Sequence, residues 1–269
     1  MFNLNALARE LKTAQDEVRQ IAPFTGRIDG FDEAAGYEVA RIIHEARLRE
    51  GRRPIGRKIG FTNRNIWPEY GVYAPVWGYV YDTTVTDVAD ARAVCRIGRL
   101  AEPRIEPEIV LRFASTPPVT DDPRAILACV DWIAHGFEIV QSHFPGWKFA
   151  AADTIADDGL HGTLLVGPRR RVAELGSDVA ARLAQFRIEL LCGGELRDTG
   201  TGANVLDGPL QAIAHLLAVL DRSGAPPLAA GEIVTTGTLT RALPIAAGEN
   251  WSTRIEGIDL PGLTATFER

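Results

Sequence analysis

Apolar side chains recur at helical spacing over the first part of the chain. Residues 4–21 place leucine, alanine, valine and isoleucine three or four positions apart with charged residues between them, which predicts an amphipathic helix ending before Pro23. A second helix is expected to begin after Asp32, a favourable N-cap residue, and to end at Gly51. Together these segments predict a small helical unit over residues 1–54.

Beyond this unit the pattern changes to short runs rich in branched and aromatic residues, which are typical of strands. The expected strands are residues 55–61, 78–85, 105–113, 137–140, 163–166, 186–191, 233–236 and 263–267. Two helices are expected among them, one near residues 124–135 and one that opens at Pro209 and ends at Gly224. So many strands without regular helical crossovers favour a mixed or antiparallel core. The chain is therefore predicted to be α+β, with a β-rich domain over residues 55–269.

Composition excludes several classes of protein. The 269 residues are 46% hydrophobic and 24% charged, as expected of an ordinary globular chain, and the formal net charge of -6 provides no attraction to nucleic acid or to anionic membranes. No apolar stretch reaches the roughly 18 residues of a membrane span. The three cysteines are far apart and form no C-x-x-C motif, which argues against a disulfide framework or a zinc site. We expect a cytoplasmic protein with neither a nucleic-acid nor a membrane partner.

Three glutamates form the candidate chemical centre. A strand period of two places Glu106 and Glu108 on one face, about 7 Å apart, where both can reach one ion. Pro107 between them cannot donate to a ladder, which predicts an edge or a bulge. Glu138 lies within an apolar run, where a charge is costly unless it is paired or bound to a metal. Three oxygen ligands suit Mg²⁺ or Mn²⁺, although a solvated strand face is the alternative interpretation of two glutamates at this spacing.

The order of several motifs resembles the fumarylacetoacetate hydrolase superfamily, and within it the hydratase/decarboxylase branch. The resemblance covers most of the chain. It rests on residues 56–62, 103–109, 138–140 followed by Trp147, 153–157, 200–203 through 209–210, and 231–240.

This resemblance implies a β-rich core of the fumarylacetoacetate hydrolase C-terminal-domain type, preceded by the small helical unit. It implies that Glu106, Glu108 and Glu138 bind Mg²⁺ or Mn²⁺, that Lys58 lies beside the substrate, and that the protein is a homo-oligomer. Gly56 and Gly60 leave little bulk on the strand face that carries Lys58, so a ligand could approach its ammonium closely.

Two segments depart from the pattern of the hydratases. Pro75-Val76-Trp77-Gly78 stands where the hydratases usually have Pro-Asp-Phe-Gly, and residues 157–160 stand where they have Asp-Asn-x-Ser. Two polar groups expected near the water-handling chemistry are therefore replaced, which leaves the hydration step and the substrate open.

Three further residues are candidates for the site. His161 could replace the lost serine as a general acid or base, the alternative being a loop histidine in contact with solvent. Lys148 could bind a substrate carboxylate as a point charge, or could be a plain surface lysine. Thr238, held by the turn at Gly237, could donate a hydrogen bond to the same carboxylate.

The predicted function is that of a metal-dependent lyase that hydrates a 2-hydroxydienoate or its 2-keto-4-enoate tautomer in aromatic-compound catabolism. The substrate is a small 2-keto acid whose developing enolate charge the metal stabilises. Decarboxylation of a vinylogous 2-keto acid, of the 4-oxalocrotonate type, and C–C hydrolysis of an acylpyruvate are the alternatives. A keto-acid-binding protein without activity is the rival from another class, and Lys58 and His161 argue against it.

Overall fold

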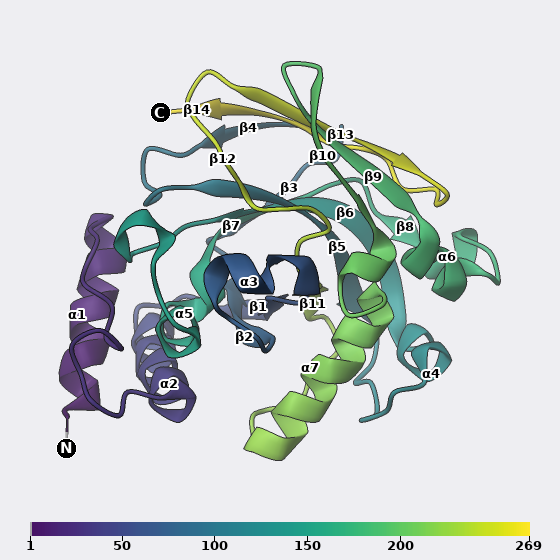
Figure 1. The fold of residues 1–269 in the computed structure, drawn as a ribbon. Coiled ribbons are helices and arrows are strands. Elements are labelled where there is room, and N and C mark those ends of the chain that lie inside the picture. Colours follow the sequence, from purple (N-terminus) through teal and green to yellow (C-terminus); the bar gives the residue numbers. More distant parts are fainter. Residues whose placement is uncertain (1) are drawn as a thin grey trace.

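The computed structural model describes residues 2–269, which form two layered β-sheets flanked by helices (Figure 1). The larger sheet has nine strands, of which seven follow the order β2-β1-β11-β5-β6-β7-β3, while β12 pairs with β5 and β8 with β6. Its strands are β1 (Pro54–Gly60), β2 (Val76–Tyr81), β3 (Val85–Asp87), β5 (Arg104–Phe113), β6 (Val130–Val140), β7 (His161–Val166), β8 (Arg170–Arg171), β11 (Ile233–Thr235) and β12 (Leu243–Pro244).

The smaller sheet has five strands in the order β10-β9-β13-β14-β4. They are β4 (Arg92–Arg96), β9 (Arg187–Cys192), β10 (Glu195–Thr201), β13 (Asn250–Glu256) and β14 (Thr264–Glu268). The pairs β1–β11, β3–β7 and β4–β14 are parallel, and the other pairs are antiparallel. The predicted α+β class with a mixed-sheet core is thus confirmed.

Helices cover the flanks of the larger sheet, with α1, α2 and α5 on one side and α4, α6 and α7 on the other (Figure 1). The helices are α1 (Leu4–Glu17), α2 (Glu33–Arg49), α3 (Trp67–Tyr70), α4 (Pro123–Leu127), α5 (Ala151–Ala156), α6 (Val179–Gln185) and α7 (Pro209–Ser223). Short 3₁₀ turns lie at residues 64–66, 145–147, 158–160, 172–174 and 202–204. Within residues 2–269, no helix has both the length and the apolar character needed to cross a membrane.

The predicted helix ends are correct where a cap fixes them. The side chain of Asp32 accepts a hydrogen bond from the Ala35 amide at the start of α2, and α7 begins at Pro209 and ends with Gly224 in a left-handed conformation. The first helix ends earlier than predicted, at Glu17, because Val18 adopts a left-handed conformation and its amide caps the helix.

The helical unit shares an apolar cluster with the rest of the chain. Leu11, Phe24 and Val39 from this unit are buried together with Phe144 and Ala152, which come from much later in the sequence. The division at residue 54 therefore stays a prediction about chain organisation, since the helical unit and α5 form one packed layer.

One face of strand β5 is apolar and buried along its length. Ile109 and Leu111 of β5 pack towards α7 and its neighbouring helices, whereas Ile105 of β5 and Ile139 of β6 pack towards the smaller sheet. Because side chains alternate along a strand, Glu106 and Glu108 point to the opposite face. The register of β5 thus separates the structural core from the candidate site.

The predicted helix near residues 124–135 is correct at its start and wrong beyond Leu127. Helix α4 ends at Leu127, and β6 begins at Val130 and continues to Val140. This strand is buried on both faces, so its sequence lacks the alternation of apolar and polar residues that marks a half-exposed strand.

The prediction of an edge or bulge at Pro107 is also wrong. Strand β5 lies between β6 and β11, and its pairing with β6 passes Pro107 without a shift in register. On the side of β5 away from β6, the pairing with β11 ends before Pro107 is reached and that with β12 lies beyond it. There the carbonyl of Pro107 accepts a hydrogen bond from the amide of Leu239, which lies in the segment between β11 and β12. A ladder donor is not needed at that point, so a proline is tolerated in a central strand.

Strands β4, β10 and β13 of the smaller sheet were not predicted. Their sequences are polar and partly exposed, as in the segment Glu195–Thr201. Their stability depends on partners that lie far away in the sequence, which local patterns do not reveal.

We predict that Phe24→Ala lowers the free energy of unfolding by about 3–5 kcal/mol. The Phe24 side chain is fully buried, and its ring contacts those of Phe31 and Phe144, so truncation leaves a cavity between the helical unit and the rest of the chain. Urea unfolding followed by circular dichroism measures the change. Tyr73→Ala, at a side chain that is 65% exposed, is the control and should change the free energy by less than about 0.5 kcal/mol. An unchanged midpoint for Phe24→Ala would show that this layer does not stabilise the protein.

Candidate active site

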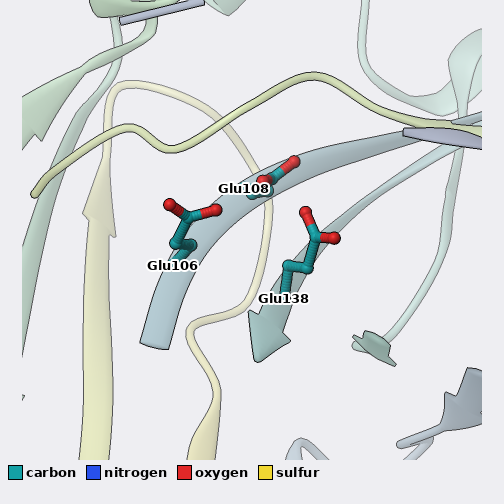
Figure 2. A group of neighbouring side chains, drawn as sticks. All are labelled: Glu106, Glu108 and Glu138. Carbon is teal, nitrogen blue, oxygen red and sulfur yellow. The ribbon is translucent and has the colours of Figure 1, made fainter. Parts of the chain in front are cut away.

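The centre of the larger sheet brings three glutamates together. Glu106 of β5 and Glu138 of β6 are direct cross-strand partners, and Glu108 lies one strand repeat further along β5. The three residues each offer an oxygen atom within 4.8 Å of those of the other two. Figure 2 shows the carboxyl groups gathered over the two neighbouring strands. The predicted trio is thus assembled by the register of one antiparallel pair.

Burial makes this arrangement electrostatically costly. Burial raises the pKa of Glu106 to about 7, and the neighbouring Glu138 carboxylate adds to the rise. Burial and the two neighbouring carboxylates likewise hold the pKa of Glu108 well above its ordinary value. Burial alone would raise the pKa of Glu138, but the Lys58 ammonium and the hydrogen bond from His161 lower it to about 2. The surroundings therefore favour the ionised form of Glu138 and oppose ionisation of Glu106 and Glu108, an effect that a nearby cation would offset.

The environment of Glu108 shows what could satisfy the trio. Its Oε2 accepts hydrogen bonds from the Thr235 hydroxyl and from the Gly237 amide, the latter at 2.7 Å. Its Oε1 is buried and has no hydrogen-bond partner among the described residues. An unpartnered buried oxygen is unfavourable, and a cation within the trio would satisfy it. Oxygen ligands of this kind suit a hard divalent cation, so these residues fit a divalent metal.

Lys58 lies directly beside the carboxylates. Its Nζ is 3.2 Å from Glu138 Oε2 and donates a hydrogen bond of 2.8 Å to the Gly159 carbonyl, and its side chain is 2% exposed. Burial alone would lower the pKa of Lys58, but the three carboxylates, Glu138 above all, raise it above the ordinary value. The expectation that two glycines leave space around the ammonium holds for Gly60, where a side chain would contact that of Lys58, but not for Gly56, where it would collide with Ile233. Gly159, which was not predicted, is the second glycine against the Lys58 side chain.

A small cavity opens next to this group. Lys58 and Glu106 are its charged lining residues, and Phe61, Tyr70 and Trp147 contribute aromatic surface to its walls. Residues other than the three glutamates hold these walls in place. The Trp147 indole donates a hydrogen bond to the Glu102 carbonyl, and the Tyr70 hydroxyl accepts one from Arg104. A small molecule with one anionic end and one apolar end matches this lining.

The other predicted residues differ in their placement. His161 contacts Glu138, with Nδ1 2.8 Å from Glu138 Oε1. Lys148 is exposed and is not among the residues that line the cavity, although its neighbour Trp147 is. Thr238 is buried, and its hydroxyl donates to the Thr240 carbonyl. The structure therefore joins Lys58, His161 and the three glutamates, while substrate binding by Lys148 and Thr238 stays a prediction.

Sequence reasoning does not find two groups that orient the trio. Gly237, at φ +98°, allows its amide to reach Glu108, and a side chain there would collide with Thr62. Thr235 at the end of β11 supplies the hydroxyl. The sequence shows Gly237 as a turn signal directly after a predicted strand, but it does not show that the Gly237 amide reaches Glu108 on another strand.

The two segments that depart from the hydratase pattern lie in contact with each other. The Tyr79 amide donates to Asp158 Oδ1 at 2.7 Å, and a side chain at Gly78 would overlap Asp158. Burial raises the pKa of Asp158 to about 6. Asp158 and the two residues after it all have positive φ and form a tight turn. The carbonyl of Gly159, the middle residue of this turn, accepts the hydrogen bond from the Lys58 ammonium.

Most of the chain matches a known protein family. Residues 72–266 match the family described as fumarylacetoacetate (FAA) hydrolase C-terminal. The chain belongs to the fumarylacetoacetate hydrolase family. This finding confirms the resemblance on which the predicted glutamates and Lys58 were placed.

Several family members resemble this chain over almost its whole length. It is 32% identical to 2-keto-4-pentenoate hydratase 2 of Dechloromonas aromatica (strain RCB), with 94% of each chain covered. It is 31% identical to 2-hydroxyhexa-2,4-dienoate hydratase of Comamonas testosteroni, over 93% of this chain and 92% of the relative. A solved structure of 4-oxalocrotonate decarboxylase from Pseudomonas putida G7, complexed with magnesium and adipate, matches with a TM-score of 0.88 and 25% identity, covering 98% of this chain and 97% of that one.

We predict that Glu108→Gln stabilises the metal-free protein and abolishes divalent-metal binding. The amide keeps one oxygen for Thr235 and Gly237, and its NH₂ group can donate towards the two remaining carboxylates, which removes a repulsion and an unpartnered atom worth about 1–3 kcal/mol. Urea unfolding in EDTA and in Mn²⁺ measures both effects. Mn²⁺ at a hundred times its Kd should stabilise the natural protein by about 2.7 kcal/mol and leave the variant unchanged.

Glu195→Gln, on an exposed residue of β10, is the matched control for this experiment and should keep the natural response to Mn²⁺. A Glu108→Gln protein that is less stable in EDTA and still stabilised by Mn²⁺ would contradict the assignment of the trio as a metal site.

Proposed function

We propose that this protein is a divalent-metal-dependent lyase that adds water to a 2-hydroxydienoate or its 2-keto-4-enoate tautomer. The observation that carries the proposal is the trio of Glu106, Glu108 and Glu138 with the Lys58 ammonium 3.2 Å from one of them, next to a cavity that Lys58 and Glu106 line. The proposal is supported by the similar hydratases of Dechloromonas aromatica and Comamonas testosteroni, whose names give a 2-keto-4-enoate and a 2-hydroxydienoate as their substrates.

The bound cation would be held by the three glutamates and would supply stabilisation of the negative charge that develops on the 2-oxygen and carboxylate of the substrate. Lys58, which lines the cavity, would hold a proton at Nζ within reach of a substrate bound there. The Gly159 carbonyl fixes the direction of that ammonium. Phe61, Tyr70 and Trp147 would exclude bulk water from the hydrocarbon end of the substrate.

Mg²⁺ or Mn²⁺ is the ion we propose, because carboxylate oxygens are the ligands that both prefer. The magnesium in the decarboxylase of Pseudomonas putida G7 supports this choice. We further propose that the chain acts in aromatic-compound catabolism, that it is cytoplasmic and that it assembles as a homo-oligomer. Light scattering that gives a mass near the 29.2 kDa of one chain at working concentration would contradict assembly.

Decarboxylation of a vinylogous 2-keto acid is the second candidate. The 0.88 TM-score to 4-oxalocrotonate decarboxylase supports it. Val76 and Asp158 stand at positions where the hydratase pattern has other residues, which leaves the hydration step open. The same cavity and cation could also assist C–C hydrolysis of an acylpyruvate.

One screen separates these reactions. Purified protein with Mg²⁺ or Mn²⁺ is incubated with 2-hydroxypentadienoate, 4-oxalocrotonate and an acylpyruvate, and ultraviolet absorbance is followed before mass spectrometry of the products. Hydration adds the mass of water, decarboxylation removes that of CO₂, and hydrolysis yields two fragments. A protein that binds the acids but converts none would contradict the enzyme assignment.

We predict that Lys58→Met lowers turnover by a factor of about 10²–10⁴ while Mn²⁺ binding survives. Methionine keeps the approximate bulk of the side chain but removes the proton and a positive charge 3.2 Å from Glu138, so the cation should bind at least as tightly as before. Steady-state kinetics and calorimetric titration with Mn²⁺ measure the two effects.

Lys58→Arg should not restore turnover, because the planar guanidinium needs more space than Gly60 and Gly159 leave and cannot take the place of the compact ammonium. Lys12→Met, on helix α1, is the matched control and should leave turnover unchanged. Near-normal turnover of Lys58→Met would mean that the catalytic proton comes from another group.

A further inference from the structure

His161 has both ring nitrogens engaged. Nδ1 lies 2.8 Å from Glu138 Oε1, and Nε2 lies 2.8 Å from the Thr84 hydroxyl. The side chain is 3% exposed, so the ring is enclosed by its partners. Neither nitrogen is left to face a substrate, which is at odds with the expectation that His161 replaces a missing serine as a general acid or base.

The two oxygens of Glu138 have different partners. Oε1 is held by His161, whereas Oε2 faces the Lys58 ammonium at 3.2 Å and the Thr235 hydroxyl at 3.5 Å. Since a carboxylate only accepts hydrogen bonds, Nδ1 is the donor to Oε1. The imidazole thereby fixes the rotation of the carboxyl group about its last bond.

A β-bulge brings His161 to this position. Along β7, Leu164 pairs with Glu138 and Thr163 with Ile139, but Val140 pairs with His161. Gly162 is the extra residue, and a side chain there would lie 2.4 Å from the Ile139 carbonyl oxygen. Strict alternation would turn His161 to the face opposite Glu138, and the extra residue turns it back to the same face.

Thr84 is itself firmly placed. Its backbone carbonyl accepts hydrogen bonds from the Leu164 amide at 2.8 Å and from the Thr163 hydroxyl at 2.9 Å. Both donors belong to β7, the strand that begins at His161. The imidazole is therefore held between Glu138 and a residue anchored to its own strand.

We propose that His161 is a positioning residue that fixes Glu138 as a metal ligand, with Thr84 holding the far side of the ring. The inference rests on the proposed metal-dependent function. Groups that hydrogen-bond to metal ligands orient them, and their loss typically costs a factor of about 10–100 in metal affinity or activity. His161 acts through Glu138 and transfers no proton to the substrate.

The test compares His161→Asn with His161→Leu. An asparagine amide nitrogen occupies nearly the place of Nδ1 and can still donate to Glu138, whereas leucine has similar bulk to histidine and no donor. We expect His161→Leu to bind Mn²⁺ about 10–100-fold more weakly in calorimetric titration. His161→Asn should recover most of the natural affinity and turnover, although an amide cannot serve as a general acid or base at neutral pH.

Two further variants complete the test. Thr84→Val removes the hydroxyl that holds Nε2 and should cause a smaller loss of Mn²⁺ affinity, which keeps the inference testable if His161→Leu does not fold. His215→Asn on α7 removes a histidine elsewhere and should leave Mn²⁺ affinity unchanged.

The outcomes separate this inference from the proposed function. If the natural protein neither binds Mn²⁺ nor converts a keto acid, the proposed function fails. If it does both and His161→Leu binds Mn²⁺ normally, only the positioning role is overturned. Natural Mn²⁺ affinity in both His161 variants, with turnover lost in both, would instead assign His161 a direct part in proton transfer.

Discussion

The structure depends on holding three carboxyl groups within 4.8 Å of one another in a buried place. Like charges at this distance repel, and burial removes the water that would screen them. The protein offsets this cost unevenly. Glu138 contacts the Lys58 ammonium and the His161 imidazole. One oxygen of Glu108 accepts hydrogen bonds from the Thr235 hydroxyl and the Gly237 amide, and its other oxygen has no partner among the described residues. A cation bound by the three carboxyl groups would offset the remaining imbalance.

This constraint explains why the site lies in the middle of a sheet. Glu106 and Glu138 face each other only in the observed register of β5 and β6, and a slip by one residue would turn one of them into the apolar core. That core, with Ile105 and Ile139 packed against the smaller sheet, makes any other register unfavourable. Hydrophobic packing on one face thus fixes carboxylate geometry on the other.

How much of this could be predicted depended on whether the information was local. The spacing of Glu106 and Glu108, the apolar setting of Glu138 and the caps of α7 are local features, and each was found from the sequence. The strand at Val130–Val140 was taken partly for a helix because a strand buried on both faces has no alternation. The contact of His161 with Glu138 depends on one extra residue in β7, and the direction of a side chain beyond a bulge cannot be read from periodicity.

The helical unit takes part in the site through the turn at residues 157–160. Asp157 is bound by the buried imidazole of His143 at 2.9 Å and by the Gln15 amide of α1 at 3.0 Å. The turn that follows has three residues with positive φ, two of them not glycine, a conformation that persists only when its surroundings hold it. Its Gly159 carbonyl accepts the hydrogen bond from Lys58. The first helix therefore helps to set the direction of the ammonium on which the proposed chemistry depends, and the helical unit and the β-rich part act as one structure at this point.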